Sequence, residues 1–401
     1  MMDKHPSNHR VLFVDDEPNI LSGLRRSLRS ERGKWEIYFA TSGEEALQLL
    51  TETPVDVVVS DMWMPGMNGA KLLNEVARLW PQTIRFVLSG HSDEKSILSL
   101  VGTAHRYLAK PCDPEMLKSV LERAFMLCGL LQDDRLKSLI GSIDSLPSYP
   151  AIYQKLTRRL ADPDASLREI GQLIAEDPPI AAKMLQMVNS SFFGIGRRIS
   201  NPEEAAGLLG MDTLKSLVLT TGIFRQFETD KKSESAALRE IWHHSVTVGC
   251  LARDIVREEE SDPSKQDDAL TAGLLHDIGL MLFLFRLPDL WRKAQAVVAS
   301  EGVSHWQAEE RLAGATHSKL GAYLLGLWGL PESLVEAIAY MHTPNKAPTR
   351  SFGTLTAVHV ADALLQDDHR LDKDYLTSLG LENRLDAWRS MAESVMAENG
   401  Q

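Results

Sequence analysis

The first 125 residues of the chain alternate short apolar runs with amphipathic stretches. The runs are Val11–Val14, Glu36–Phe39, Val55–Ser60, Ile84–Leu88 and His105–Leu108. The first and the third, Val-Leu-Phe-Val and Val-Asp-Val-Val-Val, lack polar alternation over most of their length, as strands buried on both faces of a sheet do. A helical stretch follows each run, beginning near Pro18, Gly43, Gly69, Asp93 and Asp113. This alternation predicts an α/β domain, built on a five-stranded doubly wound parallel sheet with helices on both faces.

The pattern changes after Phe125, where the strand signals end. We expect one helix to run from residue 113 through residue 140 without a break. From residue 146 onward nearly every stretch has the 3.6-residue apolar period of an α-helix, and the charged stretch Glu258–Asp268 indicates a loop. The sequence therefore predicts an α/β domain over 8–127, a helical connector over 128–145 and an all-α domain over 146–401, divided into a subdomain over 146–230 and a core over 236–370.

Composition excludes several classes of protein. With 401 residues the chain is too long for one hydrophobic core, since single cores stop growing near ~250–300 residues. The net charge of -12 disfavours bulk binding of nucleic acid. The 3 cysteines form no C-x-x-C motif, which fits a reducing compartment. No run of about 18 apolar residues occurs, so no stretch is expected to span a bilayer. From the charge, the cysteines and the lack of such a run, we expect a cytoplasmic protein that binds neither DNA nor a membrane.

Polar residues follow the predicted strands, where ligands collect in an open parallel sheet. The first strand ends in Asp15 and Asp16, the third in Asp61, the fourth in Ser89 and the fifth in Lys110. Crowded carboxylates repel one another unless a cation compensates them, and hard oxygen ligands suit Mg²⁺. A lysine and a hydroxyl can hold phosphate oxygens, so the pattern favours phosphoryl transfer onto a carboxylate. Each residue alone could be a helix cap, a turn residue or a surface charge, but all five at matching strand ends favour one shared site.

Residues 10–125 resemble the receiver domains of two-component response regulators, which have a flavodoxin-like fold. The resemblance rests on these strand-end residues and on the run from Asp61 to Gly69, Asp-Met-Trp-Met-Pro-Gly-Met-Asn-Gly. It implies that Asp61 is the phosphoacceptor, that Lys110 contacts the phosphoryl group, and that Ser89 and Tyr107 form the switch. It also implies a histidine kinase partner and a Mg²⁺ site whose ligands are Asp15, Asp16, Asp61 and the backbone carbonyl of Trp63.

Histidines and carboxylates are spread over the helical half of the chain. His276 and Asp277 are adjacent in Gly-Leu-Leu-His-Asp-Ile-Gly, and Glu240 and His244 are four residues apart and share a helix face. Further candidates are His317, His342 and Asp362. Such residues on several helices of a bundle commonly build a buried metal site. Nitrogen and oxygen donors without thiolates suit Fe, Mn, Ni, Co or Zn.

A lone histidine in an apolar helix is more often a hydrogen-bonded core residue than a ligand. The set as a whole, and no single member, therefore carries the prediction of a metal site. We leave His359 as either a supporting residue or a core residue, and we place His105 and His305 at the surface.

Residues 139–365 resemble the HD superfamily of metal-dependent phosphohydrolases, and Asp177-Pro178 and Asn189-Ser-Ser-Phe-Phe-Gly resemble its narrower HDOD family. The resemblance implies a four-ligand core of His244, His276, Asp277 and Asp362. Relatives of the HD-GYP type place second-metal ligands at His317 and His342, with Glu240 as a further acidic ligand. The pattern departs at Leu280, where the hydrolases have lysine, and at Met341, where they have a second histidine; no Gly-Tyr-Pro follows.

We therefore expect a two-component response regulator, phosphorylated on Asp61 by a histidine kinase, with an HDOD output domain that acts in signal transduction through protein interaction. Its expected partners are the kinase and an unidentified downstream protein, with a nucleotide ligand and a homodimer left open. The alternative is a phosphorylation-gated metal-dependent phosphohydrolase of a nucleotide or cyclic dinucleotide. A third alternative is a receiver that serves only for dimerisation. Because the hydrolase lysine is absent, the non-catalytic output is favoured.

Overall fold

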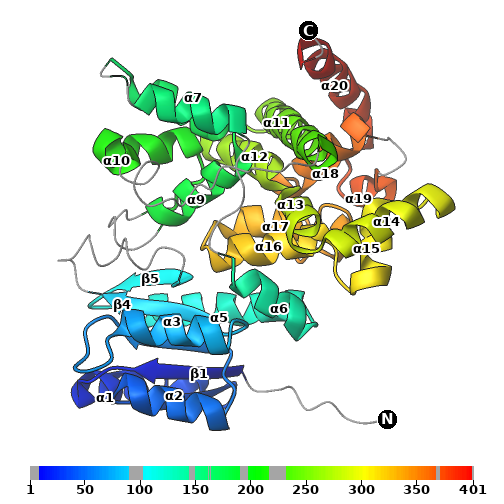
Figure 1. Cartoon of the computed structure of the whole chain (residues 1–401). Coiled ribbons are helices and arrows are strands. Elements are labelled where there is room, and N and C mark those ends of the chain that lie inside the picture. The colour runs from blue at the N-terminus through cyan, green and yellow to red at the C-terminus, as the bar shows by residue number, and fades with distance from the viewer. Residues whose placement is uncertain are drawn as a thin grey trace, which may run out of the picture. The chain divides into compact units, whose positions relative to one another are not determined.

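The computed structural model describes residues 9–89, 103–143, 150–160, 162, 164–189, 197–215, 232–366 and 371–399. The chain forms two compact units, the first built mainly from residues 1–144 and the second mainly from the residues that follow. Strands occur in the first unit, and the described residues of the second are helical (Figure 1). The predicted combination of an α/β part with an all-α part is confirmed.

One parallel sheet forms the centre of the first unit, with its strands in the order β2-β1-β3-β4-β5. All five predicted strands are present, as β1 (His9–Val14), β2 (Trp35–Ala40), β3 (Val57–Asp61), β4 (Ile84–Ser89) and β5 (Arg106–Ala109). Asp61 is paired with Leu88 across the sheet, and Ser89 with Ala109. The register therefore places the residues that end these strands along one edge of the sheet.

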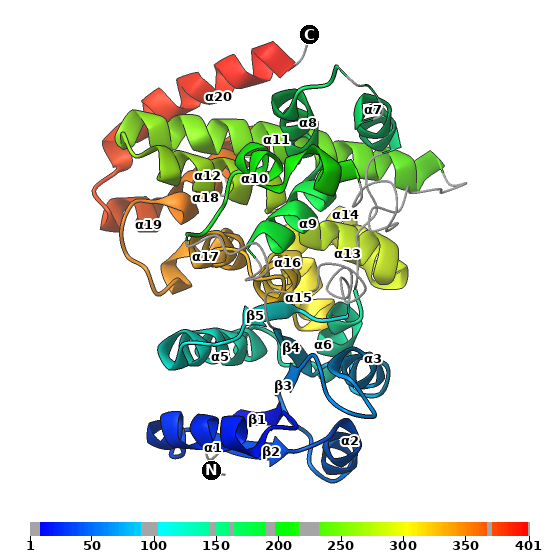
Figure 2. The ribbon, with the colours of Figure 1, turned by 90° about the vertical axis from the view of Figure 1, so that its left-hand side faces the viewer.

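Helices cover both faces of this sheet. Figure 2 shows α1 and α5 on one side of the strands and α2 and α3 on the other. The bounds are α1 (Pro18–Ser27), a 3-10 turn η1 (Arg29–Glu31), α2 (Gly43–Glu52), α3 (Gly69–Leu79) and α5 (Pro114–Leu130). Apolar side chains of β1, β3 and β4 (Leu12, Val58 and Val87) pack with α2 and α3 in one buried core. The helix predicted near Asp93 lies outside the described residues.

The connector differs from the prediction. Instead of one continuous helix, α5 ends at Leu130 and a separate helix, α6 (Asp134–Gly141), follows. The break occurs because the Asp133 side chain accepts a hydrogen bond from the main-chain N–H of Arg135 and so caps a new helix. The end of α6 packs against the chain that leads into β4, where a Cβ on Gly141 would lie 2.0 Å from the main-chain oxygen of Pro81.

A buried arginine joins α6 to the sheet. Arg85 of β4 donates from Nη2 to the carbonyl of Gly141 at 2.7 Å and from Nε to the carbonyl of Thr103 at 2.7 Å. Its main-chain N–H donates to Nδ1 of His105 at 3.0 Å. His105 is buried, so its predicted surface position is wrong; the pairing of β4 with the chain that leads into β5 encloses it.

Among the described residues, the second unit begins with four helices, α7 (Pro150–Leu160), α8 (Leu167–Ala175), α9 (Pro178–Val188) and α10 (Pro202–Lys215). Ten helices follow: α11 (Lys232–Glu259), α12 (Pro263–Leu275), α13 (Ile278–Arg286), α14 (Pro288–Glu301), α15 (His305–Ala313), α16 (His317–Leu327), α17 (Glu332–Tyr340), α18 (Thr354–Gln366), α19 (Lys373–Ser378) and α20 (Leu385–Asn399). In the part of the unit that the structure describes, two 3-10 turns, η4 (Pro344–Lys346) and η6 (Glu382–Arg384), lie among them. The long α11 packs along α12 and α18, and α20 packs on α11 (Figure 1).

The stretch predicted as a charged loop, Glu258–Asp268, is partly helical. Helix α11 runs to Glu259, and α12 begins at Pro263 after the Asp262 side chain accepts a hydrogen bond from the main-chain N–H of Ser264. The local signal was present in the sequence, since a proline after a capping aspartate is typical of a helix start.

Close helix contacts in the second unit depend on glycines. A Cβ on Gly273 of α12 would lie 2.6 Å from the Cα of Gly249 on α11. A Cβ on Gly279 of α13 would lie 1.9 Å from the main-chain oxygen of His317 on α16. Because no side chain fits at either contact, these glycines let the main chains of four helices approach one another around residues 273–279.

Helices α12 and α13 form a 24-residue stretch, Pro263–Arg286, whose length and composition would allow it to cross a membrane. However, 78% of its most apolar window is buried inside the structure. Apolar helices of this kind are also the usual core of a helical protein, and the burial favours that interpretation.

Candidate functional site

Three carboxylates lie together at the carboxyl edge of the sheet. Asp15 and Asp16 follow β1, Asp61 ends the neighbouring β3, and a carboxylate oxygen of each lies within 4.8 Å of the others. A Cβ on Gly69 would lie 2.1 Å from the main-chain oxygen of Asp61, so glycine is needed where α3 begins against this edge. The fold thus gathers the acidic residues that the sequence places after separate strands.

Lys110 is the cation of this pocket. Its Nζ lies 2.7 Å from Oδ2 of Asp15 and 2.6 Å from Oδ1 of Asp61. Burial raises the pKa of Asp61, and Lys110 opposes that rise. Burial also acts to lower the pKa of Lys110, but the two carboxylates outweigh it and the pKa is raised. Each of the two residues therefore favours the charged form of the other.

The pocket fits a hard divalent cation. Lys110 contacts two of the three carboxylates, and oxygen ligands in excess of positive charge are the environment that Mg²⁺ prefers. The Trp63 side chain, two residues after Asp61, is 53% exposed. Tyr107 of β5 packs against the core beneath α2 and α3, and its burial raises the pKa of its phenol. Ser89 ends β4, but its side chain lies outside the described residues.

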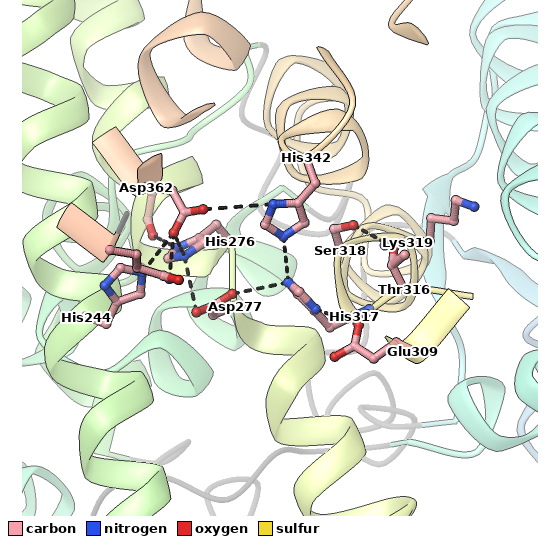
Figure 3. Close-up of polar contacts among 12 residues, drawn as sticks. His244, His276, Asp277, Glu309, Thr316, His317, Ser318, Lys319, His342 and Asp362 are labelled. Carbon is pink, nitrogen blue, oxygen red and sulfur yellow. Dashed lines mark hydrogen bonds and ion pairs between the residues drawn. The ribbon is translucent and has the colours of Figure 1, made fainter. Parts of the chain in front are cut away.

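In the second unit the structure brings six predicted ligand residues together (Figure 3). They come from five places in the fold: α11, the junction of α12 and α13, the start of α16, the turn after α17, and α18. In that order they are His244, His276 with Asp277, His317, His342 and Asp362. Figure 3 shows the two carboxylates between two pairs of histidines, which we call the first pair (His244 and His276) and the second pair (His317 and His342).

The first pair faces one oxygen of each carboxylate. Nε2 of His276 lies 3.3 Å from Oδ2 of Asp277 and 3.6 Å from Oδ1 of Asp362, and Nε2 of His244 lies 2.9 Å from the same Asp362 oxygen. His276 is fully buried, and its Nδ1 donates to the carbonyl of Gly273 at 2.6 Å. Within the described part of the chain, its Nε2 has no partner with hydrogen-bond geometry.

The second pair faces the other oxygens. Nε2 of His317 lies 3.5 Å from Oδ1 of Asp277, and Nδ1 of His342 lies 3.9 Å from Oδ2 of Asp362. The two Nε2 atoms of this pair are 2.9 Å apart. Each carboxylate therefore offers one oxygen to each histidine pair.

The electrostatics of the group reflect its burial. Burial acts to lower the pKa of His276, but the charges of Asp277 and Asp362 outweigh it and the pKa is raised. Burial also acts to raise the pKa of each carboxylate, but the surrounding histidines hold both values below the ordinary range. In the second pair, burial and the charge of His317 lower the pKa of His342 to about 3. Positive charge at this group thus comes from imidazole protons, which a metal cation can replace.

The group fits a metal ion with nitrogen and oxygen ligands. Ligand atoms held at ~2.1 Å from one cation are about 3.0 Å apart at right angles and about 3.4 Å apart in a tetrahedron. The separations of 2.9, 3.3 and 3.6 Å around Oδ1 of Asp362 and Nε2 of His276 lie within about 0.2 Å of this range. Nε2 of His276 is buried beside two carboxylate oxygens, the position of a metal-binding nitrogen in a histidine whose other nitrogen donates to a carbonyl.

Glu240 and His359 lie outside this group. Glu240 is exposed on α11, one turn before His244. His359 is buried, with Nδ1 donating to the carbonyl of Met341 at 2.6 Å and Nε2 accepting from the main-chain N–H of Asp372 at 3.0 Å. Both ring nitrogens are used by main-chain partners, as in a hydrogen-bonded core histidine.

Two residues that contact the group were not found from the sequence. Glu309 of α15 is buried and accepts hydrogen bonds from His317. Gln366 of α18 places its Nε2 2.7 Å from Nε2 of His244 and 2.8 Å from Oδ1 of Asp362. Gln366 is four residues after Asp362, so helix periodicity could have indicated it, whereas nothing in the sequence separates Glu309 from Glu310.

Comparison with protein families identifies both parts of the chain. Residues 11–122 match the response regulator receiver domain, and residues 146–344 match the HDOD domain. The chain therefore contains a receiver domain followed by an HDOD domain. Receiver domains generally bind Mg²⁺, and HD-type domains bind metals.

Curated relatives match parts of the chain. An uncharacterized protein of Treponema pallidum (strain Nichols) is 24% identical over 229 residues, 57% of this chain and 44% of the relative. The hydrogenase transcriptional regulatory protein HoxA of Cupriavidus necator is 34% identical over 163 residues, 40% of this chain and 32% of the relative. The chain thus spans less than half the length of either relative.

Solved structures also match each part. The signal receiver domain of an HD domain-containing protein from Pseudomonas fluorescens Pf-5 is 33% identical, with a TM-score of 0.29, and the match covers 30% of this chain and 95% of that one. An HDOD domain protein of unknown function from Geobacter sulfurreducens is 22% identical, with a TM-score of 0.37 and coverage of 68% and 98%.

Proposed function

We propose that the chain is a response regulator in which a histidine kinase phosphorylates Asp61 and the HDOD domain delivers the signal through protein interaction. The observation that carries this proposal is the contact of 2.6 Å between Lys110 Nζ and Asp61 Oδ1 in a pocket of three carboxylates. Such a pocket concentrates acceptor and cation at the position where a phosphoryl group would arrive.

In the proposed reaction an Asp61 carboxylate oxygen attacks the phosphorus of a phosphohistidine. The O–P bond forms as the N–P bond breaks, and the leaving imidazole takes up the proton that it needs from solvent. Lys110 is within reach of the transferred oxygens, while Asp15, Asp16 and the Trp63 carbonyl would hold the Mg²⁺ ion. When bound, Mg²⁺ neutralises charge on the phosphoryl oxygens. Ser89 and Tyr107 would then respond to the new charge as the switch.

The partner in this reaction is a histidine kinase, and we place the reaction in the cytoplasm. The cysteines Cys112, Cys128 and Cys250 are free thiols, as a reducing compartment requires. The downstream partner is an unidentified protein.

Acetyl phosphate with Mg²⁺ tests the acceptor directly. Intact-mass and peptide mass spectrometry should find one phosphoryl group on Asp61 of the wild type and none on the Asp61→Asn variant. Asp56→Asn is the matched control, because Asp56 precedes the same strand at the opposite edge of the sheet. An unmodified wild-type chain, or equal labelling of the Asp61→Asn variant, contradicts the proposal.

A second candidate function is a metal-dependent phosphohydrolase of a nucleotide or cyclic dinucleotide, controlled by the receiver. The observation that favours it is the buried Nε2 of His276, which lies beside oxygens of Asp277 and Asp362. These residues and His244 would hold one metal ion, and the second pair would hold another. A metal held there supplies Lewis-acid chemistry for hydrolysis of a phosphoester.

Metal analysis and a general phosphodiester assay test this candidate. Protein purified without added metal should contain Fe, Mn, Ni, Co or Zn and hydrolyse bis-p-nitrophenyl phosphate, and the His276→Ala and Asp277→Ala variants should lose both properties. His243→Ala is the control, since His243 is the exposed neighbour of His244 on α11. Metal without turnover leaves a structural site within the signalling domain; equal metal in the His276→Ala variant removes the candidate.

A further inference from the structure

Glu309 on α15 contacts one histidine of the metal group twice. Its Oε2 accepts the main-chain N–H of His317 at 2.7 Å and the Nδ1 of the same residue at 2.7 Å. Glu309 is 0% exposed, and within the described residues its Oε1 has no hydrogen-bond partner. A buried carboxylate in this state is costly, so its position calls for a specific reason.

The double contact fixes both the position and the tautomer of His317. One hydrogen bond ties the start of α16 to α15, and the other directs the ring so that Nε2 faces Asp277 and His342. Because Nδ1 donates to the carboxylate, the neutral ring presents a lone pair at Nε2. A carboxylate hydrogen-bonded to the far nitrogen of a histidine also increases the basicity of that ligand.

The same helix supports the other member of the second pair. The ring of Trp306 stacks on the ring of His342, with centroids 6.0 Å apart and planes 10° from parallel. Trp306 and Glu309 are three residues apart and therefore lie on one face of α15. One helix thus contacts both histidines of the second pair.

The adjacent Glu310 has the same side chain as Glu309 but is exposed, so burial distinguishes the two glutamates. Glu310 is exposed, and its carboxylate pairs with Lys319 Nζ at 3.1 Å. The two glutamates are adjacent on one helix, so substitutions at them change the same charge and the same helix propensity.

We propose that Glu309 is a positioning residue that fixes His317 and thereby creates a second metal position, distinct from the one at His244 and His276. The proposal rests on the second candidate function, the metal-binding HD-type site. It adds that metal binding at the second pair depends on α15, whereas metal binding at the first pair does not.

Cobalt titration of the full chain tests the proposal, with excess Mg²⁺ present to occupy the receiver pocket. Co²⁺ bound by histidine and carboxylate is followed by its visible absorption and by calorimetry. We expect two Co²⁺ equivalents in the wild type and in Glu310→Gln. In Glu309→Gln the first equivalent should be unchanged and the second should bind 10–100-fold more weakly, as typical for loss of such a partner. His317→Ala provides the reference for loss of the second position.

The outcomes separate this proposal from the candidate on which it rests. Two equally tight equivalents in Glu309→Gln overturn the role of Glu309 and leave the metal site standing. Equal weakening of both equivalents also overturns it, because Glu309 would then support the fold as a whole. A wild type that takes up no Co²⁺ overturns both. Circular dichroism checks folding, and Glu309→Gln retains an oxygen acceptor for His317, so that variant remains informative if Glu309→Ala fails to fold.

Discussion

Asp277 and Asp362 each direct one oxygen toward the first histidine pair and the other toward the second. Neither carboxylate therefore belongs to one half of the group. Each histidine, by contrast, belongs to one pair and therefore to one half of the group. This difference makes the effects of single substitutions on metal content unequal.

Asp277→Asn should reduce both Co²⁺ equivalents, because it removes the negative charge that both halves share and replaces one of the two ligand oxygens with an amide nitrogen. His244→Ala should reduce only the first equivalent, and His317→Ala only the second. Calorimetry and elemental analysis of the three variants measure this. If Asp277→Asn removed one equivalent and left the other at wild-type affinity, the shared position of Asp277 would be contradicted.

Lys110→Met should destabilise the receiver in the absence of Mg²⁺, because Asp15 and Asp61 lose the cation that lies between them. We expect a loss of about 2 kcal/mol in the free energy of unfolding, between the values for surface and buried ion pairs. Mg²⁺ should restore more stability to the variant than it adds to the wild type, since it supplies the missing positive charge.

Urea unfolding with and without Mg²⁺ measures this difference. Lys71→Met is the control, because Lys71 is exposed on α3 and its loss should change stability by less than about 0.5 kcal/mol. Equal responses of Lys110→Met and the wild type to Mg²⁺ would count against a shared acidic pocket.

Gly279→Ala should disturb the metal group without changing any ligand. Its Cβ would lie 1.9 Å from the main-chain oxygen of His317, so α13 and α16 must separate. We expect a loss of roughly 3 kcal/mol in stability and weaker binding of Co²⁺. Gly207→Ala is the control, since nothing lies within 4 Å of its Cβ and alanine favours helix by up to about 1 kcal/mol. Thermal unfolding of both variants measures the change in stability, and cobalt titration measures the change in Co²⁺ affinity.

The stability of the first unit should depend on pH through Glu31. Its carboxylate contacts Lys118 Nζ at 2.8 Å and Lys34 Nζ at 3.2 Å, and the hydrogen bond from Lys118 is the main reason that its pKa is lowered to about 2. A pKa below the ordinary value of 4.5 means that this contribution is complete above pH 4.5 and is lost as the pH falls toward 2.

Urea midpoints at several pH values for the wild type and for Glu31→Gln measure this contribution. The difference in stability between the two proteins should be constant above pH 4.5 and should shrink below it. Lys118→Met should abolish most of the pH dependence of this difference. A difference that grows as the pH falls would have the wrong sign for a lowered pKa.

Much of the first unit follows from sequence because each step is local. The apolar runs, which alternate with amphipathic stretches, predict where the strands lie. The parallel arrangement of the strands then places Asp15, Asp61 and Lys110 at one edge of the sheet. The position of His105 could not be obtained in this way, because it depends on the main chain of Arg85 on the neighbouring strand. The break before α6 had a local signal in Asp133, but the apolar period across residues 126–145 concealed it.

The helical site was predictable as a set of residue types and not as a geometry. His276 and Asp277 were marked by their adjacency and by Gly279, whose lack of a side chain permits the contact with His317. The division of the group into two histidine pairs depends on which oxygen of each carboxylate faces which ring. Glu309 was missed because its distinction from Glu310 is burial, which arises only when α15 packs against α16.

Two consecutive ligands, His276 and Asp277, occupy the bend at which α12 ends and α13 begins. The distance between their two side chains consequently depends on the backbone conformation of this bend. A metal bound to both side chains would stabilise one angle between α12 and α13. By thermodynamic reciprocity, any partner protein that preferred one angle would raise or lower the affinity for that metal to the same extent that the metal altered the partner's own affinity.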